Sequence, residues 1–117
     1  MLEIQENVPA IIAYHDLQQR IVWANRAYRQ ALGVSLQELD GQACYRLWGL
    51  SKPCRDCPVA EALATGETAE SELTPETQDE WPEDLGSWLI RAVPIREQNG
   101  RIAGAVEVAL EVTERKK

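Results

Sequence analysis

The stretch Trp88–Val112, WLIRAVPIREQNGRIAGAVEVALEV, contains the strongest signals for the fold of this chain. Its two apolar runs flank Asn99-Gly100, a dipeptide that favours the type I′ turn of a β-hairpin. Side chains after the turn alternate between two faces of a strand. One face carries Ile102, Val106, Val108, Leu110 and Val112, and the other carries Ala103, Ala105, Glu107, Ala109 and Glu111. The stretch therefore predicts a long antiparallel hairpin, in which Pro94 indicates an edge strand or a bulge.

The first third of the chain predicts another hairpin and then a helix. The apolar runs Pro9–Asp16 and Ile21–Trp23 are separated by a short polar step, so we expect them to pair. Asn25 is a candidate helix N-cap for residues 26–32, and Gly33 follows as a C-terminal stop.

The middle of the chain predicts further short helices. Ser35 and Glu38 have the spacing of a capping box, and residues 44–49 form another short helical piece. A further helix begins with Pro58 in its first turn, and residues 68–76 are a polar strand candidate. The order is two strands, three or four short helices and three strands. It predicts an α+β domain with helices gathered on one side of an antiparallel sheet.

Composition places the chain among ordinary globular domains. It has 117 residues, of which 44% are hydrophobic and 26% charged, which suits one domain with a single core. A net charge of −7 without a basic patch argues against nucleic-acid binding. No apolar run approaches the roughly 20 residues of a membrane helix, and the N-terminus lacks the apolar region of a signal peptide. We therefore expect a cytoplasmic domain that has no membrane contact and keeps its thiols reduced.

Four segments in a characteristic order carry a family resemblance: HDLQQRIVWANRAY (15–28), GVSLQELDGQ (33–42), WLIRAVPIREQNGRIAGAVEV (88–108) and EVTERKK (111–117). They resemble the PAS sensory domain of bacterial signal-transduction proteins over about residues 5–115. The resemblance implies a PAS-like five-stranded antiparallel sheet in the order 2-1-5-4-3, with short helices on one face. It also implies one domain with an N-terminal cap (1–9), a PAS core (10–113) and the start of a connector to an output domain (114–117).

The resemblance also implies a small-molecule pocket between the sheet and the helices. The implied lining residues are His15, Tyr45, Trp48, Trp88, Ile90, Glu107 and Ala109, together with Cys44, Ala92 and Ala105. Glu107 would be costly in an apolar pocket unless it bound a ligand or paired with His15. A one-residue slip of the strand would instead place Glu107 in solvent. The family usually has a glycine where this chain has Gln18-Gln19, so the type of the first turn stays open.

All three cysteines lie in one segment, Cys44-x9-Cys54-x2-Cys57-Pro58, just before and at a helix start. A metal or iron–sulfur site at Cys44, Cys54 and Cys57 is one interpretation, with a further ligand from a second chain or from outside the domain. A thiol redox switch is another, because a helix N-terminus favours thiolates. The third is that the cysteines only pack.

The sequence argues against haem and flavin as cofactors. The helix PVAEALATG lacks the axial histidine of haem-binding relatives. GQACYRLW lacks the polar residues that hold flavin in related photosensors. The ligand therefore stays unknown at this stage, and the lone histidine, His15, is most often structural in such a setting.

We expect a sensory domain that responds to a small ligand or to redox or metal state and controls a C-terminal output domain. A diguanylate cyclase or the histidine kinase of a two-component system would be such an output. The alternative is a structural homodimerisation module without a ligand. An enzyme is disfavoured, since no nucleophile–base pair or phosphate loop is recognisable.

If Ala105 and Ala109 face inward, Val106, Val108 and Leu110 face out and need cover, which predicts a homodimer.

Overall fold

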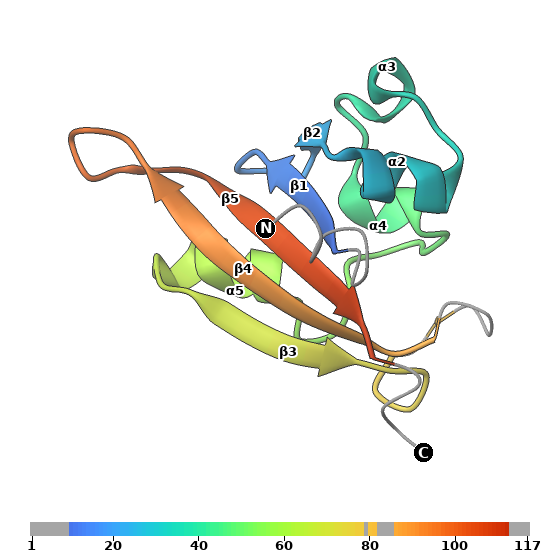
Figure 1. The fold of residues 1–117 in the computed structure, drawn as a ribbon. Coiled ribbons are helices and arrows are strands. Elements are labelled where there is room, and N and C mark those ends of the chain that lie inside the picture. The colour runs from blue at the N-terminus through green and yellow to red at the C-terminus, as the bar shows by residue number, and fades with distance from the viewer. Residues whose placement is uncertain (1–9, 79, 82–85, 113–117) are drawn as a thin grey trace.

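The computed structural model describes residues 10–78, 80, 81 and 86–112, and within them five strands form one antiparallel sheet (Figure 1). The strands are β1 (Ile11–His15), β2 (Ile21–Ala24), β3 (Ala69–Leu73), β4 (Trp88–Arg96) and β5 (Ile102–Glu111). Their order, β2-β1-β5-β4-β3, confirms the predicted topology. The expected N-terminal cap (1–9) and connector (114–117) lie outside the described residues.

Four described helices connect β2 to β3 and cover one face of the sheet (Figure 1). They are α2 (Arg26–Leu32), α3 (Leu36–Leu39), α4 (Cys44–Leu47) and α5 (Pro58–Thr65). The Asn25 side chain caps α2 by accepting from the Tyr28 N–H and also accepts from the Ile12 N–H, which ties the helix to β1. Ser35 and Glu38 form the predicted capping box of α3. The α+β class is therefore confirmed.

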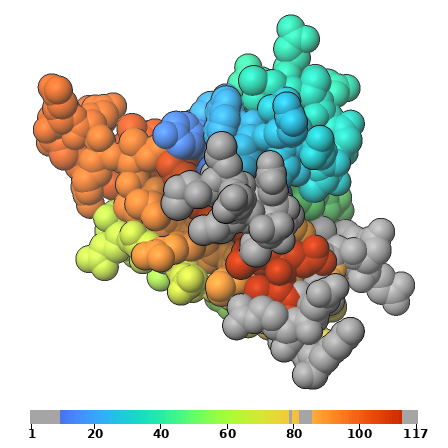
Figure 2. All heavy atoms as spheres, in the orientation of Figure 1, coloured from blue at the N-terminus to red at the C-terminus, as the bar shows by residue number. Residues whose placement is uncertain are grey.

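The β4–β5 hairpin differs from the prediction in its turn. Gly100 donates to the Glu97 carbonyl, and Glu97 donates to the Arg101 carbonyl, which makes a three-residue loop. Gly100 has φ 92°, whereas Asn99 is not left-handed, so the predicted type I′ turn is wrong. A type I turn followed by a left-handed glycine closes such loops. Figure 2 shows the hairpin tip extending beyond the body of the domain.

Pro94 sits where the sheet tolerates a residue without an N–H. It pairs with Ala105 on β5, while the pairing of β3 with β4 ends at Ala69 and Ala92. At Pro94, therefore, the edge of β4 that faces β3 has no strand partner among the described residues. A register shift follows between Ile95 and Arg96. Both features agree with the expected edge or bulge.

Two apolar clusters fill the space between helices and sheet. The larger one contains Tyr28, Leu39, Leu73 and Ile90, among others. The smaller one lies under α5 and consists of Val59, Ala62, Ala69, Ala92 and Ala105. Ala92 and Ala105 were expected to face a ligand pocket. Instead they pack in this second cluster, because their small side chains let α5 lie close against the sheet.

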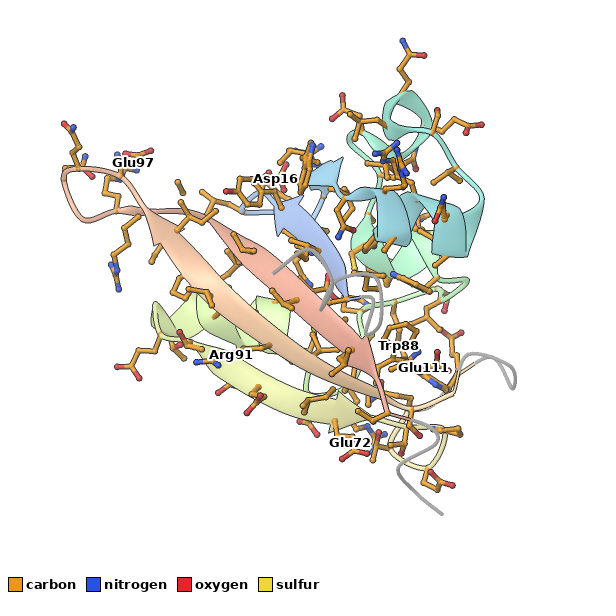
Figure 3. All side chains as sticks on the ribbon, in the orientation of Figure 1. Asp16, Glu72, Trp88, Arg91, Glu97 and Glu111 are labelled. Carbon is orange, nitrogen blue, oxygen red and sulfur yellow. The ribbon has the colours of Figure 1, made fainter. Side chains whose placement is uncertain are left out.

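The opposite face of the sheet carries an apolar row and, on β3 and the neighbouring part of β4, charged side chains. Trp23, Tyr14, Val106 and Val93 form one cross-strand row over β2, β1, β5 and β4. Figure 3 shows Arg91 and Glu72 toward the β3 side of the molecule. Val112 departs from the predicted alternation: it is buried, and its N–H donates to the Ser87 carbonyl just past the end of β5.

The structure shows which conformation the first turn adopts at Gln18-Gln19. Gln19 takes a left-handed conformation with φ 63°, the conformation that a glycine adopts without steric cost. Its N–H donates to the Asp16 carbonyl, and its side-chain Nε2 lies 3.6 Å from Cys57 Sγ. The strained turn therefore places a side-chain amide beside one of the cysteines.

Candidate functional site

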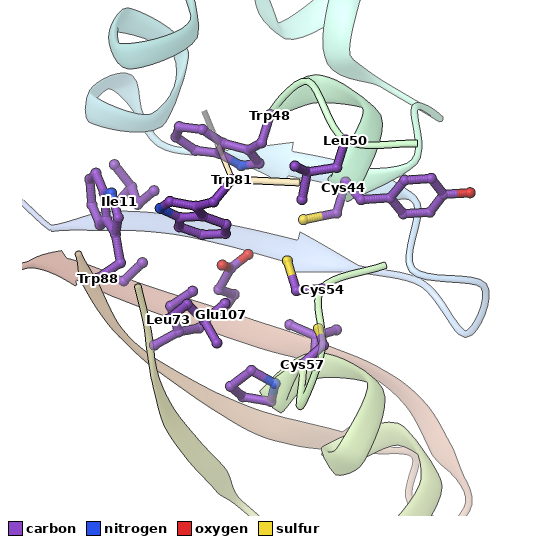
Figure 4. A pocket seen from close by; sticks show the side chains of 15 residues that line it. Ile11, Cys44, Trp48, Leu50, Cys54, Cys57, Leu73, Trp81, Trp88 and Glu107 are labelled. Atoms are coloured by element: carbon purple, nitrogen blue, oxygen red, sulfur yellow. The ribbon is translucent and has the colours of Figure 1, made fainter. Parts of the chain in front are cut away.

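A small pocket lies between the sheet and the helical layer, with a free volume of about 40 Å³ (Figure 4). Trp48, Trp81 and Trp88 line it together with all three cysteines and Glu107. Figure 4 shows the Glu107 carboxylate pointing into the pocket from β5. Among the lining residues that the structure describes there is no lysine or arginine. The pocket thus gathers several groups that can carry a negative charge, and no group that carries a positive one.

The cysteines reach this pocket from three places in the helical layer. Cys44 is the first residue of α4, Cys54 lies in the loop that follows, and Cys57 is the N-cap of α5. Asp56 turns the chain with a left-handed φ of 57° between the last two. Pro58 occupies the first turn of α5, as predicted. All three thiols are free and half-buried.

Glu107 is held from behind by His15. Glu107 Oε1 lies 2.7 Å from His15 Nε2, and the two residues are only 5% and 2% exposed. They come from β5 and β1, where Glu107 pairs with Ala13 and His15 with Ala105. The inward register of Glu107 and its pairing with His15 are therefore confirmed. His15 Nδ1 is buried and has no hydrogen-bond partner among the described residues.

Burial controls the chemistry of the thiols. It raises the pKa of Cys54 to about 12, to which the neighbouring Cys57 contributes. The same desolvation raises the pKa of Cys44 well above its ordinary range, with Glu107 adding to the effect. The pKa of Cys57 is also raised by burial, although backbone N–H groups of α5 act in the opposite direction. The expectation of thiolates activated by the helix terminus is therefore wrong for the metal-free chain, because burial dominates.

The sequence identified most of the pocket lining. Tyr45, Trp48, Trp88, Ile90, Glu107, Ala109 and Cys44 line the cavity as expected, and so do Cys54 and Cys57. His15 lies behind Glu107 instead of lining the cavity itself. The lining residues that were missed are Ile11, Leu50, Pro58, Val59, Leu73 and Trp81. Trp81 comes from an acidic loop with no periodic pattern, and its indole N–H donates to the Gly86 carbonyl at 2.6 Å.

Three donor atoms of different kinds converge at the base of the pocket. One ligand atom each from His15, Cys44 and Glu107 lies within 4.8 Å of the other two. Nitrogen, sulfur and oxygen donors at such distances are those that transition-metal sites use. Their charges also act on the other thiols, since Glu107 raises the pKa values of Cys54 and Cys57.

A five-stranded antiparallel sheet in this order, with short helices over one face and a small pocket between them, is the architecture of a class of sensory domains. The sequence profile described as PAS fold matches residues 5–117. The chain therefore belongs to the PAS fold family.

Solved structures share this fold at low sequence identity. A PAS domain from Colwellia psychrerythraea is 18% identical with a TM-score of 0.62, covering 97% of this chain and 95% of that one. A sensory box sensor histidine kinase from Vibrio cholerae is 14% identical with a TM-score of 0.66, covering 94% and 86%. An RNA-binding light-oxygen-voltage receptor is 21% identical with a TM-score of 0.68, covering 98% and 33%. These likenesses establish the fold alone.

Two further comparisons give negative results. No curated protein sequence matches the chain. Within the described residues, every helix is too short or too polar to cross a lipid bilayer.

Proposed function

We propose that this domain is a sensory module whose input is a soft metal ion bound by Cys44, Cys54 and Cys57. One observation carries the proposal: the three thiols of the segment Cys44–Cys57 converge on one cavity whose described lining contains no cationic side chain. Thiolates are strong ligands for zinc and iron, whereas thiols that merely pack have no reason to gather beside a carboxylate.

The dimensions of the cavity support an ion over a large organic group. A cavity volume of about 40 Å³ holds an ion with a few waters, since a cavity needs roughly 10–15 Å³ on this measure to hold one water. Haem and flavin are many times larger. A bound cation would also supply the charge that the buried thiols need in order to ionise, because a coordinated thiol is deprotonated outright.

A bound ion would join the helical layer to the sheet. Cys44 belongs to α4 and Cys57 to the start of α5, while the pocket floor belongs to β5. Gain or loss of the ion would shift these layers against each other, and β5 would carry the shift toward the C-terminus. We propose that a covalently linked output domain, a diguanylate cyclase or a histidine kinase, reads this shift in the cytoplasm. A purely structural homodimerisation module is the alternative.

The first test is the metal content of the 117-residue chain purified without oxygen. We expect close to one equivalent of zinc or iron per chain, and three thiols that react with a thiol reagent only after chelation. Iron with an equal amount of inorganic sulfide would identify a cluster at the same site. Three freely reactive thiols, and no uptake of added Zn²⁺ or Fe²⁺, would contradict the proposal and favour the structural alternative.

We propose further that a second copy of this chain covers the apolar row on the outer sheet face. Trp23 and Tyr14 are 42% and 44% exposed and pack edge to face with their ring centroids 6.1 Å apart, and Val93 is 41% exposed. Aromatic residues with an apolar surround are typical of interface cores. A two-fold interface would bring the row against its own copy.

Val93→Glu is expected to convert the dimer into a monomer. A charge buried twice in a two-fold interface should cost at least about 2 kcal/mol, or roughly a 30-fold weaker dimer. Leu17→Glu is the matched control, because Leu17 is 54% exposed and lies in the β1–β2 turn. Sedimentation equilibrium of both variants measures the effect. A wild-type chain that stays monomeric at high micromolar concentration would contradict the dimer.

A further inference from the structure

The floor of the pocket supplies a carboxylate beside the three thiols. We propose that Glu107 is the fourth ligand of the metal ion and that His15 is the residue that positions it, an inference that rests on the proposed metal-binding function. The site is then complete within one chain. It needs no ligand from a partner, in contrast to the expectation from the sequence.

The distance between two of the four proposed ligands, Glu107 and Cys44, suits such a site. The ligand atoms of Glu107, Cys44 and His15 already lie within 4.8 Å of one another. Around a tetrahedral ion with metal–sulfur bonds of about 2.3 Å and metal–oxygen bonds of about 2.1 Å, neighbouring donors are roughly 3.6 Å apart. Side-chain movements of about 1 Å therefore bring Cys44 and Glu107 to bonding distance. Cys54 and Cys57 line the same cavity but lie outside that group of three, so both thiols would have to approach the ion to complete a set of three sulfurs and one oxygen.

The two oxygens of Glu107 have separate roles. In the metal-bound site the Glu107 carboxylate would be ionised and would only accept hydrogen bonds, so His15 would donate through Nε2–H to Oε1, which lies 2.7 Å away. The side chain lines the cavity and points into it, which leaves its second oxygen for the ion (Figure 4). His15 is 2% exposed and lies behind the carboxylate, so it acts through Glu107. Hydrogen bonds of this kind orient metal ligands and tune their basicity.

The two residues pair with each other, and the described structure shows no further partner for the His15 ring. A carboxylate that is 5% exposed in a cavity lined mainly by apolar side chains is costly unless it is paired or coordinates a metal. His15 Nδ1 is buried without a hydrogen-bond partner among the described residues, so the bond to Glu107 is the only one its ring makes there. A bound ion would explain why the His15 ring makes its one described hydrogen bond to this carboxylate.

Titration of the 117-residue chain with Co²⁺ under argon tests the assignment. The wild type should show sulfur-to-cobalt charge-transfer bands and the intense d–d bands of a tetrahedral ion. Glu107→Gln should weaken Co²⁺ binding by more than about 100-fold and shift the d–d bands. His15→Leu should weaken it by roughly 10–100-fold, the range for residues that orient a ligand, and His15→Gln should recover much of the loss by restoring an N–H donor. The control Glu70→Gln removes an exposed carboxylate from β3 and should change nothing.

The outcomes separate this inference from the proposed function. If the wild type binds no Co²⁺, the metal-binding function itself is wrong. If the wild type binds Co²⁺ and Glu107→Gln gives the same affinity and the same d–d spectrum, the function stands and the role of Glu107 is wrong. Equal affinities of His15→Leu and His15→Gln would overturn the positioning role. Circular dichroism and urea unfolding show whether each variant is folded, and the spectrum of the residual complex reports the ligand set even in a destabilised one.

Discussion

Cys54→Ser is expected to abolish the stabilisation that a metal ion gives to the folded domain. A ligand that binds only the native state stabilises it by about 4.1 kcal/mol at 1,000 times its Kd. A serine hydroxyl is not ionised near neutral pH and is a poor ligand for a soft ion, so binding should weaken at least 1,000-fold. At the same metal concentration the ion then stabilises the folded variant by less than about 0.4 kcal/mol. Urea unfolding with and without Zn²⁺ measures both values.

Cys54 is the thiol whose replacement disturbs the fewest described contacts. Cys44 Sγ lies 4.0 Å from the Tyr28 hydroxyl, and Cys57 Sγ lies 3.6 Å from Gln19 Nε2. The matched control is Ile90→Val, which removes one methylene group from the same pocket and should cost about 0.5–1.5 kcal/mol. That variant should keep the full gain from Zn²⁺. Equal gains in Cys54→Ser and the wild type would show that Cys54 is not a ligand.

Much of the fold follows from local rules that operate within a few residues. The N-cap at Asn25 and the capping box of Ser35 and Glu38 satisfy backbone groups of their own helices, and Pro58 at the start of α5 removes a backbone N–H that would lack a partner there. Such signals do not depend on distant parts of the chain, so sequence reasoning finds them. The alternation along β5 separated its two faces for the same reason, since neighbouring side chains on a strand point to opposite faces, and the family resemblance assigned the face of Glu107 to the pocket.

The features that sequence reasoning missed depend on segments distant in the chain. Ala92 and Ala105 point to the same face of the sheet as the pocket residues, but α5 covers that part of the sheet. No pattern in the sequence of β4 or β5 indicates where α5 packs. Trp81 enters the pocket from a loop without periodicity. The turn at Asn99-Gly100 contains one left-handed residue instead of two, because pairing continues to Glu97 and Arg101.

The pKa values of the thiols also depend on segments that are distant in the chain. A Cys-x2-Cys pair at a helix start indicates low pKa values when only the helix is considered. The pKa values are raised because the apolar pocket assembles from tryptophans of α4, β4 and the loop at Trp81. Desolvation is a property of the folded environment, whereas the helix terminus is a property of the local sequence.

The raised pKa values predict opposite effects of pH on the metal-free domain and on metal binding. Each thiol holds its proton more tightly in the folded chain than in the unfolded chain, whose ordinary value is 9.0. Below pH 9 both states are protonated, and the stabilisation is fully present. As the pH rises above 9 the unfolded thiols ionise first, so stability falls until the folded pKa is reached, at about 12 for Cys54. The limiting loss is about 1.4 kcal/mol per pH unit for each thiol.

Metal affinity should instead rise with pH, because the ion must displace the thiol protons. Each displaced proton makes the affinity tenfold higher per pH unit, so three thiols give up to about 1,000-fold. Zn²⁺ competition at pH 6, 7 and 8 measures how the metal affinity changes with pH. Urea unfolding of the metal-free chain at pH 8, 9 and 10 measures how the free energy of unfolding changes with pH. Cys54→Ser should remove about one third of the stability slope, since it removes one of the three thiols. An affinity that does not change between pH 6 and 8 would mean that no thiol proton leaves on binding, which would exclude the cysteines as ligands.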